Sequence, residues 1–305
     1  MDWRENISNK LKEFLKPTQF IFNAPMSEHT TFKIGGAADI LIFPSTTAEV
    51  VKILKLINQL QMPVTILGNG SNVLVRDKGI RGAVIKFNGE FARMKCEGTK
   101  IMAGAGAKLK DVSYFAADNG LTGLEFAVGI PGSIGGAVFM NAGAYGGEMK
   151  NVISKVRAVS KSGDCAEFGI DVLDLGYRRS IFQLNGYAIC EIELQLLEGN
   201  VDEIRQAMDD FTQRRESKQP LEFPSAGSTF KRPEGHFAGT LIDKTGLKGL
   251  RVGDAMVSTK HAGFVVNAGH ATATDVLNLI NEVKRRVFEA HGVTLNPEVR
   301  IIGEQ

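Results

Sequence analysis

The chain has 305 residues, of which 43% are hydrophobic and 34 are glycine, and this length suffices for two or three domains with buried cores and many loops. Its 36 basic and 34 acidic residues nearly cancel and form no long basic run, which argues against a nucleic-acid-binding surface. The cysteines, Cys96, Cys165 and Cys190, lack metal-ligand spacing and are interpreted as reduced core thiols, and no segment approaches the roughly 18 apolar residues of a membrane span.

The first part of the chain is predicted to form a βαβ-type domain over residues 1–88. Apolar residues recur at helical spacing before Pro17 and again over 47–63, which predicts two amphipathic helices. Short β-branched runs bounded by Gly and Asn are typical of strands, and they lie at 38–43, 64–67, 72–75 and 83–87.

The rest of the chain predicts two further domains. Residues 89–205 combine many short strands with one helix at 109–120, which favours an α+β domain centred on an antiparallel sheet. A polar-faced helix over 200–218 is followed by the linker-like segment "QPLEFPS", near which a third domain is predicted to begin. The helix of that domain is predicted to have Thr274 as its N-cap and to end at Gly292.

Two glycine-rich loops are the strongest local features. "LGNGSNVLV" (67–75) directly follows a predicted strand, and its small residues could turn successive amides toward a phosphate. "VGIPGSIGGAVFMNAGAYGG" (128–147) mixes glycine with apolar residues, which indicates close approach of backbone to a ligand or to another strand. Neither GxGxxG nor GxxxxGK[ST] is matched, and an ordinary tight turn remains the alternative for each loop.

Seven motifs occur in order between residues 27 and 303: "TFKIGGAAD", "GNGSNVLV", "GIPGSIGGAVFMNAGAYGG", "YRRS", "AGSTFKRP", "HAGFVVN" and "NPEVRIIG". Together they closely resemble the UDP-N-acetylenolpyruvoylglucosamine reductases, FAD enzymes of bacterial peptidoglycan precursor synthesis. The resemblance implies an α+β, three-domain flavoprotein. A two-domain FAD-binding fold, like that of the vanillyl-alcohol oxidases, would consist of residues 1–88 with the tail 298–305 and of residues 89–205. Residues 206–297 would form the substrate-binding domain.

The resemblance also implies the cofactor contacts. FAD is expected to be bound tightly but without a covalent bond, its diphosphate held by amides of the two loops and its flavin near an arginine of the tail. The residues expected to bind FAD are Gly68, Asn69, Gly70, Ser71, Asn72, Pro131, Gly132, Ser133, Gly135, Gly136 and Arg300.

The implied reaction has two half-reactions: NADPH reduces FAD, and the enolpyruvyl ether of a UDP-sugar then accepts hydride from the flavin. An acid and donors facing the enolate are needed. Ser228 could be a nucleophile, a turn cap or a proton donor, but it lacks a GxSxG context or a nearby histidine. The resemblance assigns it as the general acid. It assigns Arg178 as the planar clamp of the substrate carboxylate and Glu298 as a hydrogen-bond donor to the enolate; composition alone would place both on the surface.

Substrate binding is predicted for Lys231, with Tyr145 and Asn267 as further candidates, although a solvated lysine, a half-buried tyrosine and a turn asparagine are the alternatives. The chain resembles the short form of the family, which lacks an inserted loop with a substrate tyrosine. No metal is expected, because no His or Cys has ligand spacing. No nucleic-acid or membrane partner is expected either. The N-terminal segment is charged throughout, which favours a cytoplasmic protein. An oxygen-using oxidase on the same flavin fold and a non-catalytic flavin-binding module are the rival readings.

Overall fold

The computed structural model describes residues 3–87 and 89–305 and divides into two compact units. Unit 1 contains the described residues within 1–22, 40–69 and 82–213, and unit 2 contains those within 23–39, 70–81 and 214–305. The division neither confirms nor excludes the three domains expected from the sequence. Of their boundaries, residue 88 lies outside the described residues, and the three-way division stays a prediction.

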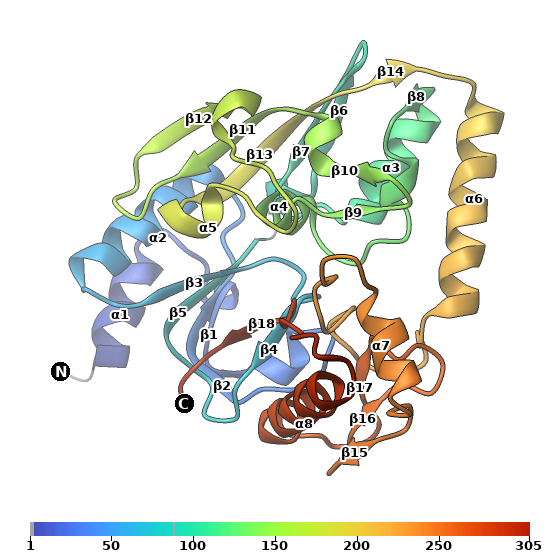
Figure 1. Ribbon diagram of the computed structural model, residues 1–305. Coiled ribbons are helices and arrows are strands. Elements are labelled where there is room, and N and C mark those ends of the chain that lie inside the picture. The colour runs from blue at the N-terminus through green and yellow to red at the C-terminus, as the bar shows by residue number, and fades with distance from the viewer. Residues whose placement is uncertain (1–2, 88) are drawn as a thin grey trace. The chain divides into compact units, whose positions relative to one another are not determined.

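Unit 1 holds most of the elements labelled in Figure 1. Its helices are α1 (Trp3–Lys12), α2 (Thr47–Gln59), α3 (Leu109–Asp118), α4 (Ile134–Met140), α5 (Phe182–Asn185) and most of α6 (Val201–Lys218). Its strands are β3 (Val64–Leu67), β6 (Met94–Glu97), β7 (Lys100–Gly104), β8 (Leu121–Thr122), β9 (Gly143–Ala144), β10 (Gly147–Glu148), β11 (Ile153–Val159), β12 (Cys165–Gly169), β13 (Ala188–Gln195) and β14 (Leu197–Glu198). β1 (Phe20–Pro25), β2 (Ala37–Ile42) and β5 (Ile80–Lys86) run from one unit into the other along the chain.

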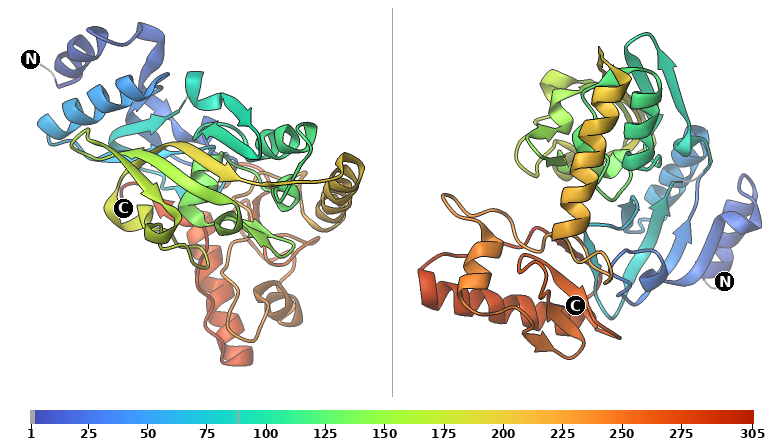
Figure 2. Two further views of the ribbon diagram at one scale, coloured as in Figure 1. Left: turned by 90° about the horizontal axis from the view of Figure 1, so that it is seen from above. Right: turned by 90° about the vertical axis from the view of Figure 1, so that its right-hand side faces the viewer.

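A five-stranded antiparallel sheet is the centre of unit 1, in the order β12-β11-β13-β7-β6. Figure 2 shows its long strands β11 and β13 lying side by side. Alternate residues of β13 are buried, as a sheet with one covered face requires, and Ile192 and Leu194 join α3 and α4 residues such as Val112 and Val138 in one core. The antiparallel sheet predicted for this region is confirmed.

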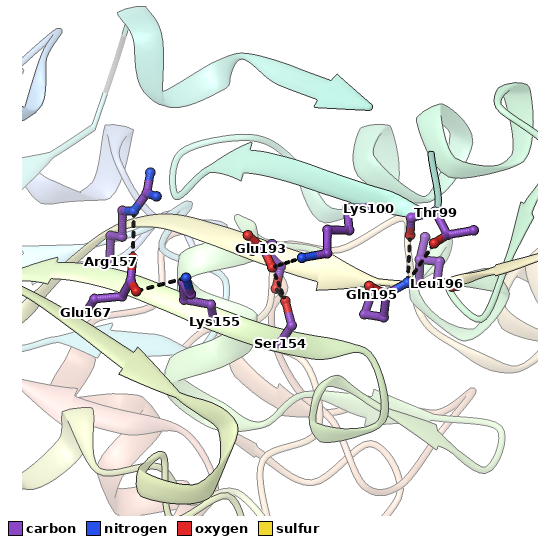
Figure 3. A network of polar contacts seen from close by, with 9 residues as sticks. All are labelled: Thr99, Lys100, Ser154, Lys155, Arg157, Glu167, Glu193, Gln195 and Leu196. Atoms are coloured by element: carbon purple, nitrogen blue, oxygen red, sulfur yellow. Dashed lines mark hydrogen bonds and ion pairs between the residues drawn. The ribbon is translucent and has the colours of Figure 1, made fainter. Parts of the chain in front are cut away.

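The other face of this sheet carries paired charges. Glu167 contacts Lys155 Nζ at 2.8 Å and Arg157 Nε at 3.1 Å, and Glu193 contacts Lys100 Nζ at 3.1 Å (Figure 3). Exposed pairs of this kind contribute little to stability individually. We therefore interpret the charges on this face as a solvated surface and not as a ligand site.

The N-terminal part of unit 1 has a second core. The apolar residues predicted at helical spacing do line one face, because Ile7 and Leu11 of α1 and Ile53 and Ile57 of α2 are at most 2% exposed and share a core. α2 begins where Thr46 Oγ1 accepts the amide of Glu49 at 3.2 Å. The strands β3 and β5 pair in parallel, but the chain between them contains β4 (Val73–Val75) and no helix. The helix of the predicted βαβ unit, α2, instead connects β2 to β3, and β5 lies between these two strands in the sheet order β1-β2-β5-β3.

Unit 2 packs a small sheet against one long helix. It contains β4 (Val73–Val75), α7 (Ala238–Lys244), β15 (Arg251–Val252), β16 (Ala255–Val257), β17 (Val265–Asn267), α8 (Ala273–His291) and β18 (Arg300–Ile302). Val276, Leu279, Ile280 and Val283 of α8 are buried against the three-stranded sheet β15-β16-β17. The tail strand β18 pairs in parallel with β4, with Arg300 opposite Val73.

The start of α8 differs from the sequence prediction. The N-cap is Thr272, not Thr274, because Thr272 Oγ1 accepts the Asp275 amide at 3.0 Å and Asp275 completes a capping box. Thr274 instead donates both its amide and its hydroxyl to Asp77. Gly292 ends the helix in the left-handed region at φ 66°, as predicted.

The cysteines are free, but the expectation of three core thiols is right only for Cys190. Cys165 is exposed on the edge strand β12 and Cys96 is half-buried. Burial raises the pKa of the Cys190 thiol to about 12, so this thiol stays protonated and unreactive. No helix in the described part of the chain has the length and apolar character needed to span a membrane.

Candidate active site

The first glycine loop, 68–72, connects β3 to β4, and the division between the two units falls between Asn69 and Gly70. Within the loop only Gly70 has a positive φ, 71°. A Cβ on Gly70 would lie 2.4 Å from the carbonyl oxygen of His29, so the packing of the chain itself requires glycine here. Of the five loop residues, Gly70 alone adopts this conformation.

The predicted FAD contacts of the second loop, residues 131–136, lie in unit 1 beside Gly68, in the part of the first loop that belongs to the same unit. A Cβ on Gly68 would be 2.5 Å from the hydroxyl oxygen of Ser133, so the glycine allows the two loops to touch. Ser133 is 4% exposed and is the N-cap of α4, where its hydroxyl accepts the Gly136 amide at 3.3 Å. The two glycine-rich loops, which the sequence analysis selected independently, thus lie next to each other at Gly68 and Ser133.

The amides of the second loop are only partly available to a ligand. Ile134 and Gly135 donate theirs to the carbonyls of Ala107 and Ala105 at 2.8 and 2.9 Å. A Cβ on Gly135 would be 2.8 Å from the Cβ of Ala105, so Gly135 is a packing glycine. Gly136 differs, because a Cβ there would meet only the Ser133 hydroxyl, at 3.5 Å, and the residue is partly exposed. This open backbone surface fits a ligand that approaches closely, as a dinucleotide diphosphate does.

Arg178 occupies the corner of a tight turn in unit 1. The amides and carbonyls of Gly176 and Arg179 exchange two hydrogen bonds of 3.1 Å, which leaves Tyr177 and Arg178 at the two central positions. Arg178 has φ 54°, a left-handed conformation that glycine or asparagine usually adopts at this position. A strained backbone at one candidate catalytic residue is consistent with a functional constraint on its direction.

Tyr145, a predicted substrate contact, is engaged within unit 1. Its ring stacks on that of Phe211 in α6, with centroids 4.5 Å apart and planes 4° apart, and its hydroxyl donates to the Phe211 carbonyl at 3.2 Å. Its ring remains 42% exposed. Contact with a substrate through the hydroxyl would therefore replace an existing hydrogen bond.

Ser228 lies on an extended segment of unit 2 that has backbone partners on both sides. On one side Thr229 donates its amide to Gly263 at 2.9 Å, and on the other its carbonyl accepts the Glu298 amide at 2.8 Å. An isolated bridge between Phe230 and Pro297 continues the second pairing. The motifs "AGSTFKRP" and "NPEVR", far apart in sequence, therefore run side by side, and Ser228 is solvent-exposed.

Glu298 and the tail are also bonded to the first glycine loop. Asn72 donates from its side-chain amide to the Glu298 carbonyl at 3.4 Å, and its own carbonyl accepts the amide of Arg300 at 3.0 Å. Asn72 thus holds the tail in place, a structural role that was not expected from its predicted contact with FAD.

The remaining predicted substrate contacts differ from one another. Lys231 has an exposed side chain and donates its backbone amide to Asn296 at 2.8 Å, close to the Ser228 segment. Asn267 is 5% exposed, and its side chain bonds the carbonyl of Phe32 and the amides of Gly269 and Ala271. The turn-asparagine alternative describes Asn267 in this structure.

A histidine that sequence reasoning did not select supports the Ser228 segment. His261 Nδ1 accepts the Gly263 amide at 3.0 Å, and the carbonyl of Gly263 is the partner of Thr229. Burial lowers the pKa of His261, so the ring stays neutral and able to accept. The described residues contain no group of three or more His, Cys, Asp or Glu that could hold a metal ion.

Comparison with known proteins identifies the family. The model of the UDP-N-acetylenolpyruvoylglucosamine reductase C-terminal domain matches residues 219–302, and that of the FAD binding domain matches residues 38–169. Relatives named UDP-N-acetylenolpyruvoylglucosamine reductase include one from Clostridium perfringens, 53% identical over 96% of both chains, and one from Clostridium kluyveri, 49% identical over 98% of both.

Solved structures agree. That of UDP-N-acetylenolpyruvylglucosamine reductase from Thermus caldophilus has a TM-score of 0.80 and 38% identity, covering 92% of this chain and 97% of its own. Alkyldihydroxyacetonephosphate synthase, 14% identical with a TM-score of 0.50 over 64% of this chain and 40% of its own, shares the flavin-binding fold alone. The chain belongs to the UDP-N-acetylenolpyruvoylglucosamine reductase family.

Proposed function

We propose that this protein reduces UDP-N-acetylglucosamine enolpyruvate to UDP-N-acetylmuramate with electrons from NADPH, as a step of peptidoglycan precursor synthesis. The observation that carries the proposal is the pairing of Thr229 with Glu298 at 2.8 Å, because it joins the two motifs that the family uses for proton donation and enolate binding. Near-full-length identity of about half with relatives of that name supports it.

The cofactor is FAD, which when bound supplies hydride to the terminal carbon of the enolpyruvyl ether. We propose that its diphosphate lies against the open backbone at Gly136 and against Gly68, where the two glycine loops touch. Two residues of the second loop support this surface, since the Ser133 hydroxyl caps α4 and the backbone of Gly135 packs on Ala105. The other loop residues and Arg300 stay predicted contacts.

The chain's own groups would act on the substrate's developing charge. The guanidinium of Arg178 would clamp the substrate carboxylate, where the enolate forms, with a planar pair of donors. Glu298, if protonated, would donate a hydrogen bond to the same enolate. Ser228 would then give its hydroxyl proton to the carbanion carbon and recover a proton from solvent, to which it is exposed.

Substrate recognition is proposed to use Lys231 for a phosphate or carboxylate, with Tyr145 and Asn267 as weaker candidates. Lys231 is the best placed, because its side chain is exposed and its backbone pairs with the segment that leads to Glu298. We further propose that the enzyme works in the cytoplasm on small molecules alone, and that residues 1–88 with 298–305, 89–205, and 206–297 form its three domains.

An anaerobic titration followed by flavin absorbance tests the proposal. The purified protein should be yellow, NADPH should bleach it, and UDP-N-acetylglucosamine enolpyruvate should restore the colour with one equivalent of reduced product. Colour that returns only with dioxygen would indicate an oxidase instead, and a protein that NADPH cannot bleach would indicate a flavin-binding module.

A further inference from the structure

The turn that carries Arg178 is held by side chains from outside the turn. A type of turn with a positive φ at its third residue favours glycine there, so the arginine at φ 54° needs external bonds to keep this shape. All of the bonds described below lie within unit 1. They connect the turn to the last residues of α4, the helix that starts at the second glycine loop.

Gln183 makes the bonds nearest to Arg178. Its Nε2 group donates to the carbonyl oxygen of Arg178 at 3.0 Å and to that of Phe139, in the last turn of α4, at 2.9 Å. A side-chain amide has two N–H groups, which suffice for these two carbonyls, and the Met140 sulfur lies 3.8 Å from Nε2 as a weaker acceptor. The buried hydroxyl of Ser180 donates to the same Phe139 carbonyl at 2.7 Å. Gln183 therefore ties the backbone of Arg178 directly to the end of α4.

Asn141 holds the opposite corner of the turn. It is 1% exposed, ends α4 in the left-handed region at φ 42°, and donates from Nδ2 to the Gly176 carbonyl at 3.0 Å. Its amide group also donates to Glu148 at 2.8 Å and accepts the amide of Lys150 at 2.9 Å. The first and third residues of the turn are thus fixed to the same helix end by two different side-chain amides.

The ion pair on the outer side of the turn cannot take over this role. Arg179 bonds Asp174 at 2.6 Å, but the two side chains are 61% and 46% exposed, and exposed pairs restrain backbone weakly.

We propose that Gln183 is a positioning residue for the reaction, which fixes the carbonyl of Arg178 to α4 and so sets the direction of the Arg178 guanidinium. The proposal rests on the proposed function of Arg178 as the substrate clamp. A bidentate contact requires both guanidinium donors to be aligned with the substrate carboxylate. A small rotation of the turn should therefore weaken this contact and slow hydride transfer to the substrate.

The test replaces Gln183 with alanine and uses Gln195→Ala as the matched control. Gln195 also donates from its side-chain amide, to Thr99 Oγ1 at 2.7 Å and to the Leu196 carbonyl at 3.2 Å, but at the end of β13 (Figure 3). In Gln183→Ala we expect wild-type flavin content and NADPH bleaching, with reoxidation by UDP-N-acetylglucosamine enolpyruvate slowed about 10- to 100-fold. Calorimetric titration of the oxidised enzyme should show weaker binding of the same substrate. Gln195→Ala should match wild type in all four measurements.

A double variant separates positioning from a general structural role. If Gln183 acts through Arg178, then Gln183→Ala should slow reoxidation much less in an Arg178→Lys background than in the wild type. Equal factors in both backgrounds, or equal slowing of the two half-reactions, would overturn the proposal.

If Gln183→Ala does not fold, Gln183→Met serves instead, because it keeps nearly the same side-chain length but has no hydrogen-bond donor. Wild-type reoxidation in that variant would overturn the proposal too. Failure of the proposed function itself would be recognised separately, because the substrate would then fail to reoxidise the flavin of the wild-type enzyme.

Discussion

Two regions carry the candidate catalytic groups, and they hold them in opposite ways. In unit 2, Ser228 and Glu298 lie on extended segments joined by backbone hydrogen bonds, such as that from Glu298 to Thr229 at 2.8 Å. In unit 1, Arg178 lies on a strained turn at φ 54° that side chains of Asn141 and Gln183 tie to a helix end.

The difference predicts different sensitivities to substitution. The backbone bonds of Thr229 do not involve the Ser228 side chain, so the Ser228 segment should keep its shape when that side chain alone is changed. The turn of Arg178 depends on specific amide side chains, because no regular ladder fixes it. Substitution of Ser228 should therefore change chemistry alone, whereas substitutions around Arg178 can act at a distance.

The largest expected effect is that of Ser228→Ala. Loss of a positioned general acid should slow reoxidation by the enolpyruvyl substrate about 10²- to 10⁴-fold, while bleaching by NADPH, which protonates no carbon, stays at the wild-type rate. Ser228→Cys should recover part of the loss. Stopped-flow flavin absorbance measures both phases.

Ser225→Ala is the matched control for this prediction, because Ser225 lies in the same paired segment and bonds Thr31 only through its backbone carbonyl. It should behave as wild type in both phases. A covalent adduct on the Ser228 peptide would indicate a nucleophile, and joint loss of both phases and of stability would indicate a structural cap.

The second glycine loop, at the start of the helix whose end is bonded to the Arg178 turn, gives the second prediction. Gly136→Leu should fold but weaken FAD binding about 10- to 100-fold, corresponding to the roughly 1 to 3 kcal/mol that overpacking costs, because the added side chain would enter the space next to the open backbone. Equilibrium dialysis of FAD against the apoprotein measures the change.

Gly169→Leu is the control, since it is exposed and has open space at its Cβ position. Gly135→Ala should differ from Gly136→Leu by destabilising the protein itself, because its Cβ would lie 2.9 Å from the Ala105 carbonyl oxygen. Normal FAD affinity in Gly136→Leu would remove Gly136 from the cofactor site.

The sequence predicted elements with clear periodicity or strong end signals. The amphipathic helices α1 and α2, the antiparallel sheet around β11 and β13, and the end of α8 at Gly292 follow from local patterns. The start of α8 was misplaced by two residues, although a local signal distinguishes the two threonines: Thr272 has Asp275 three residues later, as a capping box requires, whereas Thr274 has Leu277 there. The bonds of Thr274 to Asp77, by contrast, join distant parts of the chain.

The candidate site residues could be predicted from the sequence only where they belong to motifs that resemble those of the family. Motif resemblance selected Ser228, Arg178 and Glu298, but no local pattern distinguishes Gln183 or Asn141 from the other amide side chains of the sequence. Their roles come from tertiary hydrogen bonds to carbonyls, which any amide side chain can make. Asn72 shows the same limit, because its side chain bonds the carbonyl of Glu298, which is remote in sequence. Asn267 shows it in part, since its side chain bonds the remote carbonyl of Phe32 as well as the nearby amides of Gly269 and Ala271.

The smallest expected effect concerns acid stability of the Ser228 segment. Burial lowers the pKa of His261 in the folded state, so its contribution to stability is present above its unfolded pKa, about 6.5, and is lost as the pH falls below it. His261→Asn keeps an acceptor for the Gly263 amide but does not titrate.

Melting temperatures between pH 7 and pH 5 check this. The wild-type value should fall by a few degrees more than that of His261→Asn, and parallel curves would show that His261 does not couple to folding. Gly263 and Thr229 should remain paired in the variant at both pH values.

The most direct test of the account compares Arg178→Lys with Ser228→Ala in one stopped-flow experiment, adding NADPH and the enolpyruvyl nucleotide separately. Although the two residues are held by different means, both are assigned to the substrate's half-reaction. We therefore predict that each variant bleaches with NADPH at the wild-type rate and recovers its colour at least tenfold more slowly with UDP-N-acetylglucosamine enolpyruvate. Wild-type recovery in either variant, or slowing of both phases by the same factor, would contradict the account.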